Sequence, residues 1–496
     1  MTLRAGLILL LSLLAPAAAR AATPDRAALA ATDKIFADWQ RDAHVPGLVY
    51  GIVVDGKLVH VRGAGVQDLD SKRPVTPDTL FRIASMSKAF TALAILKLRD
   101  DGKVALDAPA ETYVPEMRGW TMPTADSPRI TVRNLLTHSA GFVEDNPWGD
   151  RQQVLPEADF TAMLRAGVPF ANAPGLGMEY SNFGYATLGR IISNVSHVRY
   201  QDYIRQTLMA PLAMNSTGYD IFKSPQARRA IGYRWQDDQW VREPDMVDGA
   251  FGAMGGVETS ANDYAHWVAF LLSAWPARDD ADAGPVRRAT VREIVTGANF
   301  GSAAMRNPAA GGQPCRQATT YGMAWRVLDD CDLGRIVTHT GGYPGYGSVV
   351  MLLPDKGVGL FAFASRTYGA PSLPALRALL ALQKAGALPD RVRTVSSGLA
   401  RAYDSARAVW LKGDIAAAPL AMNMPLDRNA AQWKAMLADL HNKVGACAAD
   451  EPIQPVSAME GRFTWACEHG TIAGRVQRAP TPEIKLQALS YAVQAE

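Results

Sequence analysis

A serine and a lysine three positions apart stand at the start of a long apolar stretch, and this arrangement constrains the fold most. The pair is Ser85 and Lys88, and residues 90–98 that follow are largely apolar. A stretch that is apolar almost all round is typical of a helix buried inside a large protein. Residues three apart share one face of a helix, so the hydroxyl and the amine can meet.

A serine hydroxyl next to an amine can act as a nucleophile, because the amine can accept the hydroxyl proton. A serine alkoxide is too basic to exist at neutral pH, so a neighbouring base must take its proton. The free N–H groups at a helix entrance also favour negative charge. With 22 serines and 13 lysines, about 0.6 such pairs arise by chance, so two ordinary polar residues in a first helical turn are an equally good interpretation of the motif alone. The interpretation therefore depends on partners elsewhere.

Length and charge limit the classes of function. A chain of 496 residues, 48% hydrophobic and 20% charged, is long enough for two or three globular domains. Its net charge of +3 and the lack of a long basic run do not support nucleic-acid binding.

The first 22 residues have the pattern of a secretory signal peptide. Arg4 is followed by a leucine-rich run too short to span a bilayer, and then by small residues suited to cleavage. An uncleaved anchor is the alternative. No later segment resembles a membrane span. The sequence thus predicts a secreted or periplasmic protein.

The four cysteines agree with export. An even number in an oxidising compartment predicts two disulfides. Neighbouring pairs are the simplest of three possible connectivities, and no C-x-x-C or Cys/His cluster suggests a metal site or another cofactor. The cysteines are Cys315, Cys331, Cys447 and Cys467.

Strand patterns lie at both ends of residues 27–385, with helical patterns between them. Residues 48–54 and 58–61 flank Asp55-Gly56, a strong hairpin signal. The middle, about 150–310, is predicted to be mostly helical. Strands are expected again at 322–328, 336–342, 348–353 and 358–364, before a helix at 372–385. The two ends must meet to complete one sheet, which predicts an α/β domain with an all-helical insert and a cleft between the parts.

The remaining residues have the pattern of a separate unit. Two amphipathic segments, 395–410 and 430–443, precede short strand-like pieces between 461 and 492. The predicted organisation is a signal peptide at 1–22, a main domain at 23–388 and a small α+β domain at 389–496. No catalytic cluster is visible in the last of these.

Partners for Ser85 come from two further segments. Tyr180 and Asn182 stand two apart in a stretch predicted to be extended, so both can face one cleft. Placed near the Lys88 ammonium, the phenol is expected to have a lowered pKa and to relay the proton of Ser85. Asn182 offers a donor and an acceptor to a substrate amide. A buried tyrosine with a turn asparagine is the alternative.

The second segment is a strand that ends in glycines. His339 and Gly341 point to the same side of it, and a glycine there lets a substrate lie against the strand edge, while Thr340 lies between them. The N–H groups of Gly342 and Ser85 are expected to form an oxyanion hole. A bare tight turn at the two glycines is the alternative. His138, after another short helix, is predicted to be structural.

These three elements, in this order, resemble the signatures of the serine β-lactamase and penicillin-binding-protein family. They are Ser85-Met86-Ser87-Lys88, Tyr180-Ser181-Asn182 and His339-Thr340-Gly341, and a tyrosine opening the second is similar to the class C branch. Leu135 to Gly141 and Gly255-Gly256 also resemble that branch. The resemblance implies an antiparallel sheet flanked by helices, a Ser85 nucleophile, and a base and acid shared by Lys88 and Tyr180.

One departure affects the expected substrate. β-Lactamases of this branch carry lysine where this chain has His339, and a histidine is only partly charged at neutral pH. The resemblance therefore implies a D-amino-acid peptidase or esterase acting on small peptides or esters. A true β-lactamase and a non-catalytic sensor of cell-wall fragments stay open. A catalytic triad of another fold is disfavoured, since no G-x-S-x-G occurs. Oligomeric state is left open.

Overall fold

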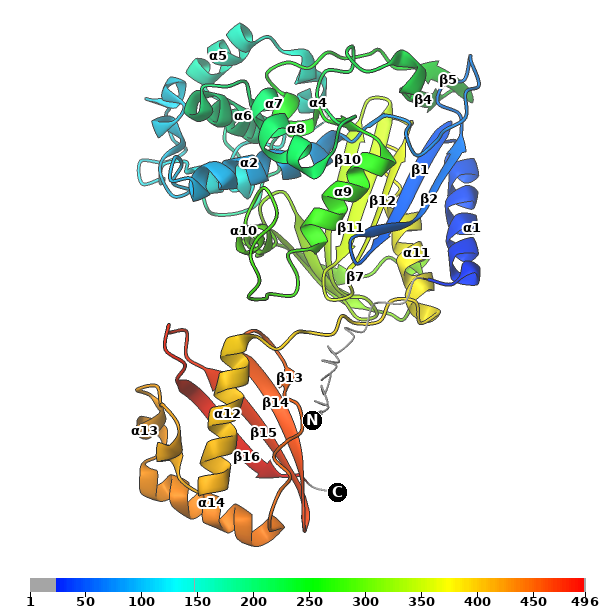
Figure 1. Cartoon of the computed structure of the whole chain (residues 1–496). Helices are drawn as coiled ribbons and strands as arrows, with labels where there is room; N and C mark the ends of the chain where they lie inside the picture. The colour runs from blue at the N-terminus through cyan, green and yellow to red at the C-terminus, as the bar shows by residue number, and fades with distance from the viewer. Residues whose placement is uncertain (1–23, 147, 495–496) are drawn as a thin grey trace, which may run out of the picture.

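The computed structural model describes residues 24–146 and 148–494, so the predicted signal peptide at 1–22 lies outside the described residues. Figure 1 shows a larger body with a central sheet and a smaller C-terminal body with its own sheet. The α-helices are α1 (Arg26–Asp42), α2 (Lys88–Asp100), α3 (Val132–Leu136), α4 (Trp148–Arg151), α5 (Glu157–Ala166), α6 (Asn182–Ser196), α7 (Tyr200–Ile204), α8 (Gly252–Gly255), α9 (Ala261–Leu272), α10 (Arg288–Glu293), α11 (Ser372–Lys384), α12 (Ser397–Lys412), α13 (Met424–Asp427) and α14 (Ala430–Val444). The strands are β1 (Gly47–Val54), β2 (Lys57–Gly65), β3 (Phe81–Arg82), β4 (Tyr233–Gln236), β5 (Gln239–Arg242), β6 (Glu258–Thr259), β7 (Asn299–Met305), β8 (Arg316–Tyr321), β9 (Arg326–Asp330), β10 (Gly334–Tyr343), β11 (Tyr346–Leu353), β12 (Val358–Ala364), β13 (Gln454–Pro455), β14 (Glu460–Cys467), β15 (Gly470–Arg478) and β16 (Leu486–Val493).

The main sheet joins the two ends of the larger body. Its eight strands run in the order β2-β1-β12-β11-β10-β9-β8-β7, and every neighbouring pair is antiparallel. Strand β1 pairs with β12 from Leu48↔Ala364 to Val54↔Val358, so segments about 300 residues apart lie side by side. The turn between β1 and β2 is Asp55-Gly56, with positive φ at both residues, as expected for the predicted hairpin.

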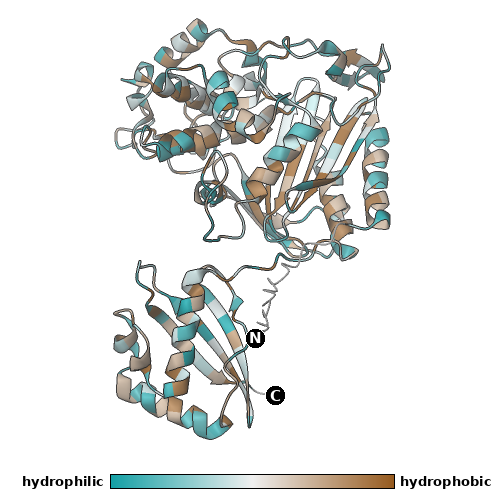
Figure 2. Cartoon of the chain, in the orientation of Figure 1, coloured by the Kyte–Doolittle hydropathy of each residue, from teal (hydrophilic) through white to brown (hydrophobic). Residues whose placement is uncertain are grey.

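Both faces of this sheet are covered, which explains its uniformly apolar central strands. All residues of β1, β11 and β12 are buried, and Figure 2 shows these central strands as hydrophobic. Helices α1 and α11 pack on one face around Phe36, Leu360 and Leu379. Helix α9 and the helical part, which contains α2, close the other face around Phe90 and Trp267. The rings of Phe90 and Trp267 are stacked, with their centroids 4.0 Å apart.

The helical part is an insertion between β3 and the return of the chain to the sheet. Helix α2 is its central element, and α6, α7 and α8 all contact it. Its residues from Lys88 to Leu96 are buried, which agrees with the apolar pattern of the sequence. The predicted sheet with a mainly helical insert is therefore present, but the insert is not all-helical, because strands β4, β5 and β6 also lie in it.

The C-terminal body has a core of its own. Its sheet runs β13-β14-β15-β16, and helices α12 and α14 pack against it around Trp410, Leu437 and Trp465. The disulfide Cys447–Cys467 lies in this body and Cys315–Cys331 in the larger one. The neighbouring connectivity is thus the one in the structure.

Three stretches differ from the sequence-based expectation. Strands β7 and β8 and the hairpin of β4 and β5 occur in or beside the segment predicted to be helical. Strand β7 is exposed along most of its length, so it has no apolar alternation by which a strand could be recognised. It is held by its backbone pairing with β8 instead. The strand expected at 322–328 begins only at Arg326, because Ala324 has a positive φ and turns the chain.

Candidate functional site

Ser85 lies on a tight turn between a short strand and a buried helix. Strand β3 ends at Arg82, a 3₁₀ turn follows at Ala84–Ser87, and α2 begins at Lys88. Ala84 has a φ of 48°, a left-handed conformation that disfavours a residue with a Cβ. The predicted helix entrance is thus preceded by one sharp turn. This turn leaves the Ser85 side chain 8% exposed, next to the start of α2.

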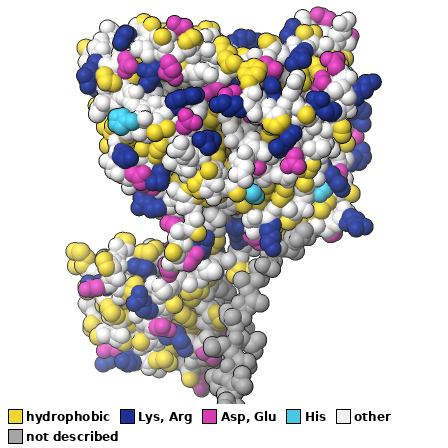
Figure 3. Space-filling view, turned by 45° about the horizontal axis from the view of Figure 1, so that its top comes forward, with side chains coloured by type: hydrophobic (Ala, Val, Ile, Leu, Met, Phe, Trp, Pro, Cys, Tyr) yellow, Lys and Arg dark blue, Asp and Glu magenta, His cyan; other side chains and the backbone are white. Residues whose placement is uncertain are grey.

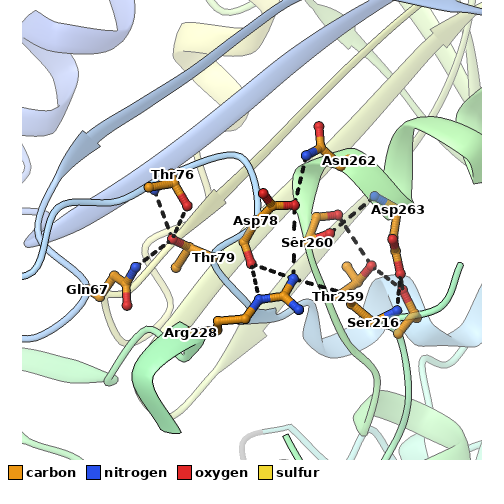
Figure 4. A network of polar contacts seen from close by, with 11 residues as sticks. Gln67, Thr76, Asp78, Thr79, Ser216, Arg228, Thr259, Ser260, Asn262 and Asp263 are labelled. Carbon is orange, nitrogen blue, oxygen red and sulfur yellow. Dashed lines mark hydrogen bonds and ion pairs between the residues drawn. The ribbon is translucent and has the colours of Figure 1, made fainter. Parts of the chain in front are cut away.

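A polar network holds the segment that leads into this turn (Figure 4). Arg228 donates to the backbone carbonyl of Asp78 at 3.0 Å and to the Ser216 hydroxyl at 3.2 Å. Asn262, in the first turn of α9, donates to the Asp78 carboxylate at 2.9 Å. Asp263 accepts from the Ser216 N–H at 2.7 Å. The chain just before β3 is therefore tied by hydrogen bonds to the start of α9.

The Lys88 amine makes three hydrogen bonds inside the protein. It donates to Ser85 Oγ at 2.9 Å, to Asn182 Oδ1 at 2.8 Å and to the Met254 carbonyl of α8 at 2.9 Å. The side chain is fully buried. Burial lowers the pKa of Lys88 to about 7, although the carboxylates of Asp150 and Asp145 oppose this shift. A substantial neutral fraction of the amine therefore exists near neutral pH.

Tyr180 lies over the Lys88 amine, but its pKa is raised, whereas a lowered pKa was expected from the sequence. The Lys88 nitrogen lies 4.9 Å from the centre of the Tyr180 ring. Burial raises the pKa of Tyr180, and its interaction with the Ser85 side chain only partly offsets this. The prediction of a lowered pKa was wrong, because loss of solvent outweighs nearby positive charge. Tyr180 is a neutral phenol at physiological pH.

Asn182 begins α6 and does not lie in an extended stretch. The preceding Ser181 is the N-cap, and its side chain accepts from the Gly184 N–H. Asp145 accepts from the backbone N–H groups of Asn182 and Phe183, each at 2.8 Å. Tyr180 and Asn182 still both reach Lys88, as the spacing suggested.

The third predicted element follows the edge of β10. Strand β9 pairs with β10 only as far as Thr338↔Arg326, so residues 339–342 have no strand on that side. The two-residue turn between Tyr343 and Tyr346 makes those residues a hydrogen-bonded pair. Gly342, one position earlier, therefore directs its N–H toward the open edge. Thr340, two positions before Gly342, faces the same edge and is exposed.

Gly341 is required by close packing against the serine turn. A Cβ at this position would lie 2.2 Å from the carbonyl oxygen of Ile83 and 2.2 Å from Ser348 Oγ. The Ser348 hydroxyl itself donates to the Ile83 carbonyl at 2.7 Å. The strand edge and the residues before Ser85 are thus held in contact, so the three sequence elements meet at one place.

His339 is buried and uncharged. Its Nδ1 bonds the Thr340 carbonyl at 2.7 Å, which makes Nδ1 the donor, and Nε2 then accepts from the Tyr321 hydroxyl at 3.1 Å. Burial and the Lys88 charge lower the pKa of His339 to about 3. His138 also has a structural contact, since its Nδ1 accepts from the Ser181 N–H at 3.1 Å.

Several residues of the site carry no sequence signal. Asp150 lies in α4, is 3% exposed, and accepts from the Tyr368 hydroxyl at 3.1 Å. Asn146 accepts from the Asn182 amide at 2.6 Å. Met254 contributes only its carbonyl. No motif marks these positions, because they belong to the site only through the folding of distant segments together.

The comparisons with known proteins agree with this geometry. A family model described as Beta-lactamase matches residues 32–385, well over half of the chain. The chain belongs to the Beta-lactamase family. The predicted family and β-lactamase-like fold are confirmed, and the prediction of a serine hydrolase is confirmed at the level of this family.

Among curated relatives of this Beta-lactamase family chain, Protein flp of Staphylococcus aureus (strain N315) is 28% identical over 67% of the chain. The aligned region spans only 62% of the length of that relative. Esterase EstB of Burkholderia gladioli is also 28% identical over 67% of the chain, and the alignment covers 95% of EstB.

Solved structures resemble the chain in fold. The octameric penicillin-binding protein homologue from Pyrococcus abyssi gives a TM-score of 0.61 at 20% identity, covering 93% of this chain and 99% of that one. A class C β-lactamase from Rhodobacter sphaeroides gives 0.55 at 24% identity, covering 72% and 99%. At these identities the likeness concerns the fold alone.

Within 24–146 and 148–494, no group of three or more His, Cys, Asp and Glu side chains is placed to hold a metal ion. Over the same ranges, no helix is long and apolar enough to cross a bilayer. On the face shown in Figure 3, basic and acidic side chains are interspersed.

Proposed function

We propose that the protein hydrolyses an ester or amide through an acyl-enzyme on Ser85. The observation that carries this proposal is the 2.9 Å hydrogen bond between a buried amine of lowered pKa and the Ser85 hydroxyl. A buried, partly neutral amine is a base suited to activating a serine near neutral pH.

The residues take the following roles in this proposal. Neutral Lys88 accepts the proton as Ser85 Oγ forms a bond to the substrate carbonyl carbon. The N–H groups of Ser85 and Gly342 stabilise the resulting oxyanion, each contributing about 3 kcal/mol. Tyr180, a neutral phenol, donates its proton to the leaving group as the bond from that group to carbon breaks. The Lys88 ammonium then returns the proton taken from Ser85 to Tyr180, so both side chains are neutral again in the acyl-enzyme. Water then attacks the acyl-enzyme by the reverse route and frees the acid.

Asn182 and the β10 edge position the substrate. Asn182 is held from three sides, by Lys88, Asn146 and the capping contact of Asp145, so its amide has a fixed orientation. The open edge at Thr340, Gly341 and Gly342 can hydrogen-bond an extended substrate as an added strand would.

The chemistry at His339 supports a peptidase or esterase acting on D-amino-acid derivatives over a β-lactamase. A neutral imidazole already bonded to Tyr321 and Thr340 offers no positive charge to a penicillin carboxylate. The similarity to an esterase, EstB, points the same way. β-Lactamase activity is the second candidate, because class C β-lactamases share the fold.

A substrate panel tests this assignment. We expect kcat/KM for a p-nitrophenyl ester and for a D-alanyl anilide to exceed that for nitrocefin by at least about tenfold. Absorbance assays on purified wild-type protein measure all three. Faster turnover of nitrocefin would overturn the assignment, and labelling of Ser85 by a fluorophosphonate with no turnover of any substrate would favour the sensor.

We also propose that the protein is exported, with residues 1–22 as the signal peptide. The two disulfides support this, since disulfides persist in oxidising compartments. Mass spectrometry of the protein from the periplasm or medium, with the N-terminal peptide identified, tests the cleavage.

Residues 389–496 are proposed to be an accessory domain that is dispensable for chemistry. Their hydrophobic core is separate from those of the larger body, and the two bodies are joined by polar contacts that include the Ser397 hydroxyl to Asp279 at 2.9 Å. A chain ending at Val395 keeps Arg391, which bonds the Leu272 and Trp275 carbonyls. We expect this truncation to retain ester hydrolysis within about threefold. A loss above tenfold, with the truncated protein still folded by circular dichroism, would contradict the proposal.

A further inference from the structure

A buried carboxylate stands beside the catalytic residues without an ionic partner. Asp150 is 3% exposed, and its negative charge acts on both Lys88 and Tyr180. Carboxylates at such depth are normally paired with a cation. Among the described residues, no Lys, Arg or His nitrogen approaches Asp150 as an ion pair. The one hydrogen bond to the carboxylate comes from the neutral Tyr368 hydroxyl.

The neighbouring cations either hydrogen-bond to other groups or form no ion pair with Asp150. The Lys88 nitrogen makes its three hydrogen bonds with Ser85, Asn182 and Met254, so it makes none with Asp150. Arg151 is exposed and forms no ion pair with Asp150, although its charge, like that of Lys88, acts on the Asp150 carboxylate. Asp145, the other carboxylate close by, is used in capping α6.

One oxygen of the carboxylate has no hydrogen-bond partner among the described residues and is not fully covered. Oδ2 receives the Tyr368 hydroxyl, whereas Oδ1 accepts no hydrogen bond from the described residues and is not enclosed by them. Tyr368 itself is 42% exposed. The Tyr368 ring lies against Gly342, because a Cβ on that glycine would come within 2.7 Å of ring atom Cδ1. The Asp150–Tyr368 pair therefore borders the open strand edge where the substrate carbonyl is proposed to sit.

We propose that Asp150, oriented by Tyr368, is the binding subsite for a primary ammonium group on the substrate. The preferred substrates are then esters or amides of amino acids with a free amino group. This inference rests on the proposed acyl-enzyme function and names the class of acyl group. An ammonium brings positive charge and three donors to a carboxylate that has one acceptor oxygen free. An N-acylated substrate lacks that charge and leaves the carboxylate unpaired.

The test compares two substrates that differ only in this group, D-alanine benzyl ester and N-acetyl-D-alanine benzyl ester. Benzyl alcohol release is measured for the full-length wild type, for Asp150→Asn, and for Asp159→Asn as a control. Asp159 is exposed on α5, so the control makes the same change of charge away from the site. Hydrolysis of p-nitrophenyl acetate by the wild type checks the acyl-enzyme function separately.

We expect the wild type to prefer the free amine by about 10- to 100-fold in kcat/KM, and Asp150→Asn to reduce this ratio at least tenfold. The control should keep the wild-type ratio. Tyr368→Phe should lower the ratio by a smaller factor, and it serves if Asp150→Asn does not fold. The inference is overturned by a wild type that hydrolyses p-nitrophenyl acetate but does not prefer the amine, or by Asp150→Asn slowing both esters equally.

Discussion

Replacing Ser85 with alanine is expected to lower hydrolysis of a p-nitrophenyl ester by about 10⁴-fold or more and to abolish covalent labelling by a fluorophosphonate. The change removes the atom that forms the acyl bond, and no other hydroxyl among the catalytic residues is both accessible and hydrogen-bonded to a base of lowered pKa. Intact-protein mass spectrometry measures the label, and a stopped assay measures turnover.

Ser87→Ala is the matched control for this experiment. Ser87 lies two residues away in the same turn and is buried, and its Oγ accepts from the Val257 N–H at 3.0 Å. Its loss should cost about 1 kcal/mol of unfolding free energy while labelling of Ser85 continues. Labelling that persists in Ser85→Ala at the wild-type rate would remove Ser85 from the nucleophile role.

The second large effect is expected for Lys88→Met, which should reduce kcat/KM by about a thousandfold or more. Methionine has a similar length but no basic nitrogen, so the proton of Ser85 has no acceptor. Tyr180→Phe should lose less, about 10- to 100-fold, because the phenol is neutral and acts on the leaving group. Circular dichroism spectra check that both variants are folded. A greater loss in Tyr180→Phe would make the tyrosine the base instead.

The pH profile gives an independent signature of the lysine. Burial lowers the pKa of Lys88 to about 7, so its neutral, basic form predominates above that pH. The wild-type kcat/KM should therefore rise with pH through about 7 and then level off. The residual rate of Lys88→Met should lack this rise. A wild-type profile that falls across the same range would contradict a neutral lysine as the base.

Local sequence patterns accounted for much of the fold because they depend on near neighbours. The three-residue spacing of Ser85 and Lys88 places both on one helical face, whatever surrounds them. The Asp-Gly turn predicts the β1–β2 hairpin, and the apolar run of α2 predicts that this helix is buried. Strand β7 was not predicted from the sequence, because its residues are almost all exposed and do not alternate between apolar and polar.

The protonation states could not be read from residue types. Spacing suggested that Lys88 would lower the pKa of Tyr180, but the pKa depends on how much water each group loses. Both side chains are desolvated in the folded protein, and burial opposes charge on each. The same loss of water keeps His339 neutral. Predicting whether each pKa is raised or lowered therefore requires the positions of all neighbouring atoms.

The sequence by itself determined which residues could do the chemistry, since an alcohol, an amine, a phenol and a glycine-rich strand carry their reactivity in any setting. It also determined that two distant sets of strands had to complete one sheet. Only the tertiary structure decided that Asp150 and Tyr368, 218 positions apart, meet beside them. The physical reason is that the affinity of a carboxylate for a cation depends on how far it is desolvated and on whether a cation of the protein already pairs with it. Both are set by the packing of the folded protein.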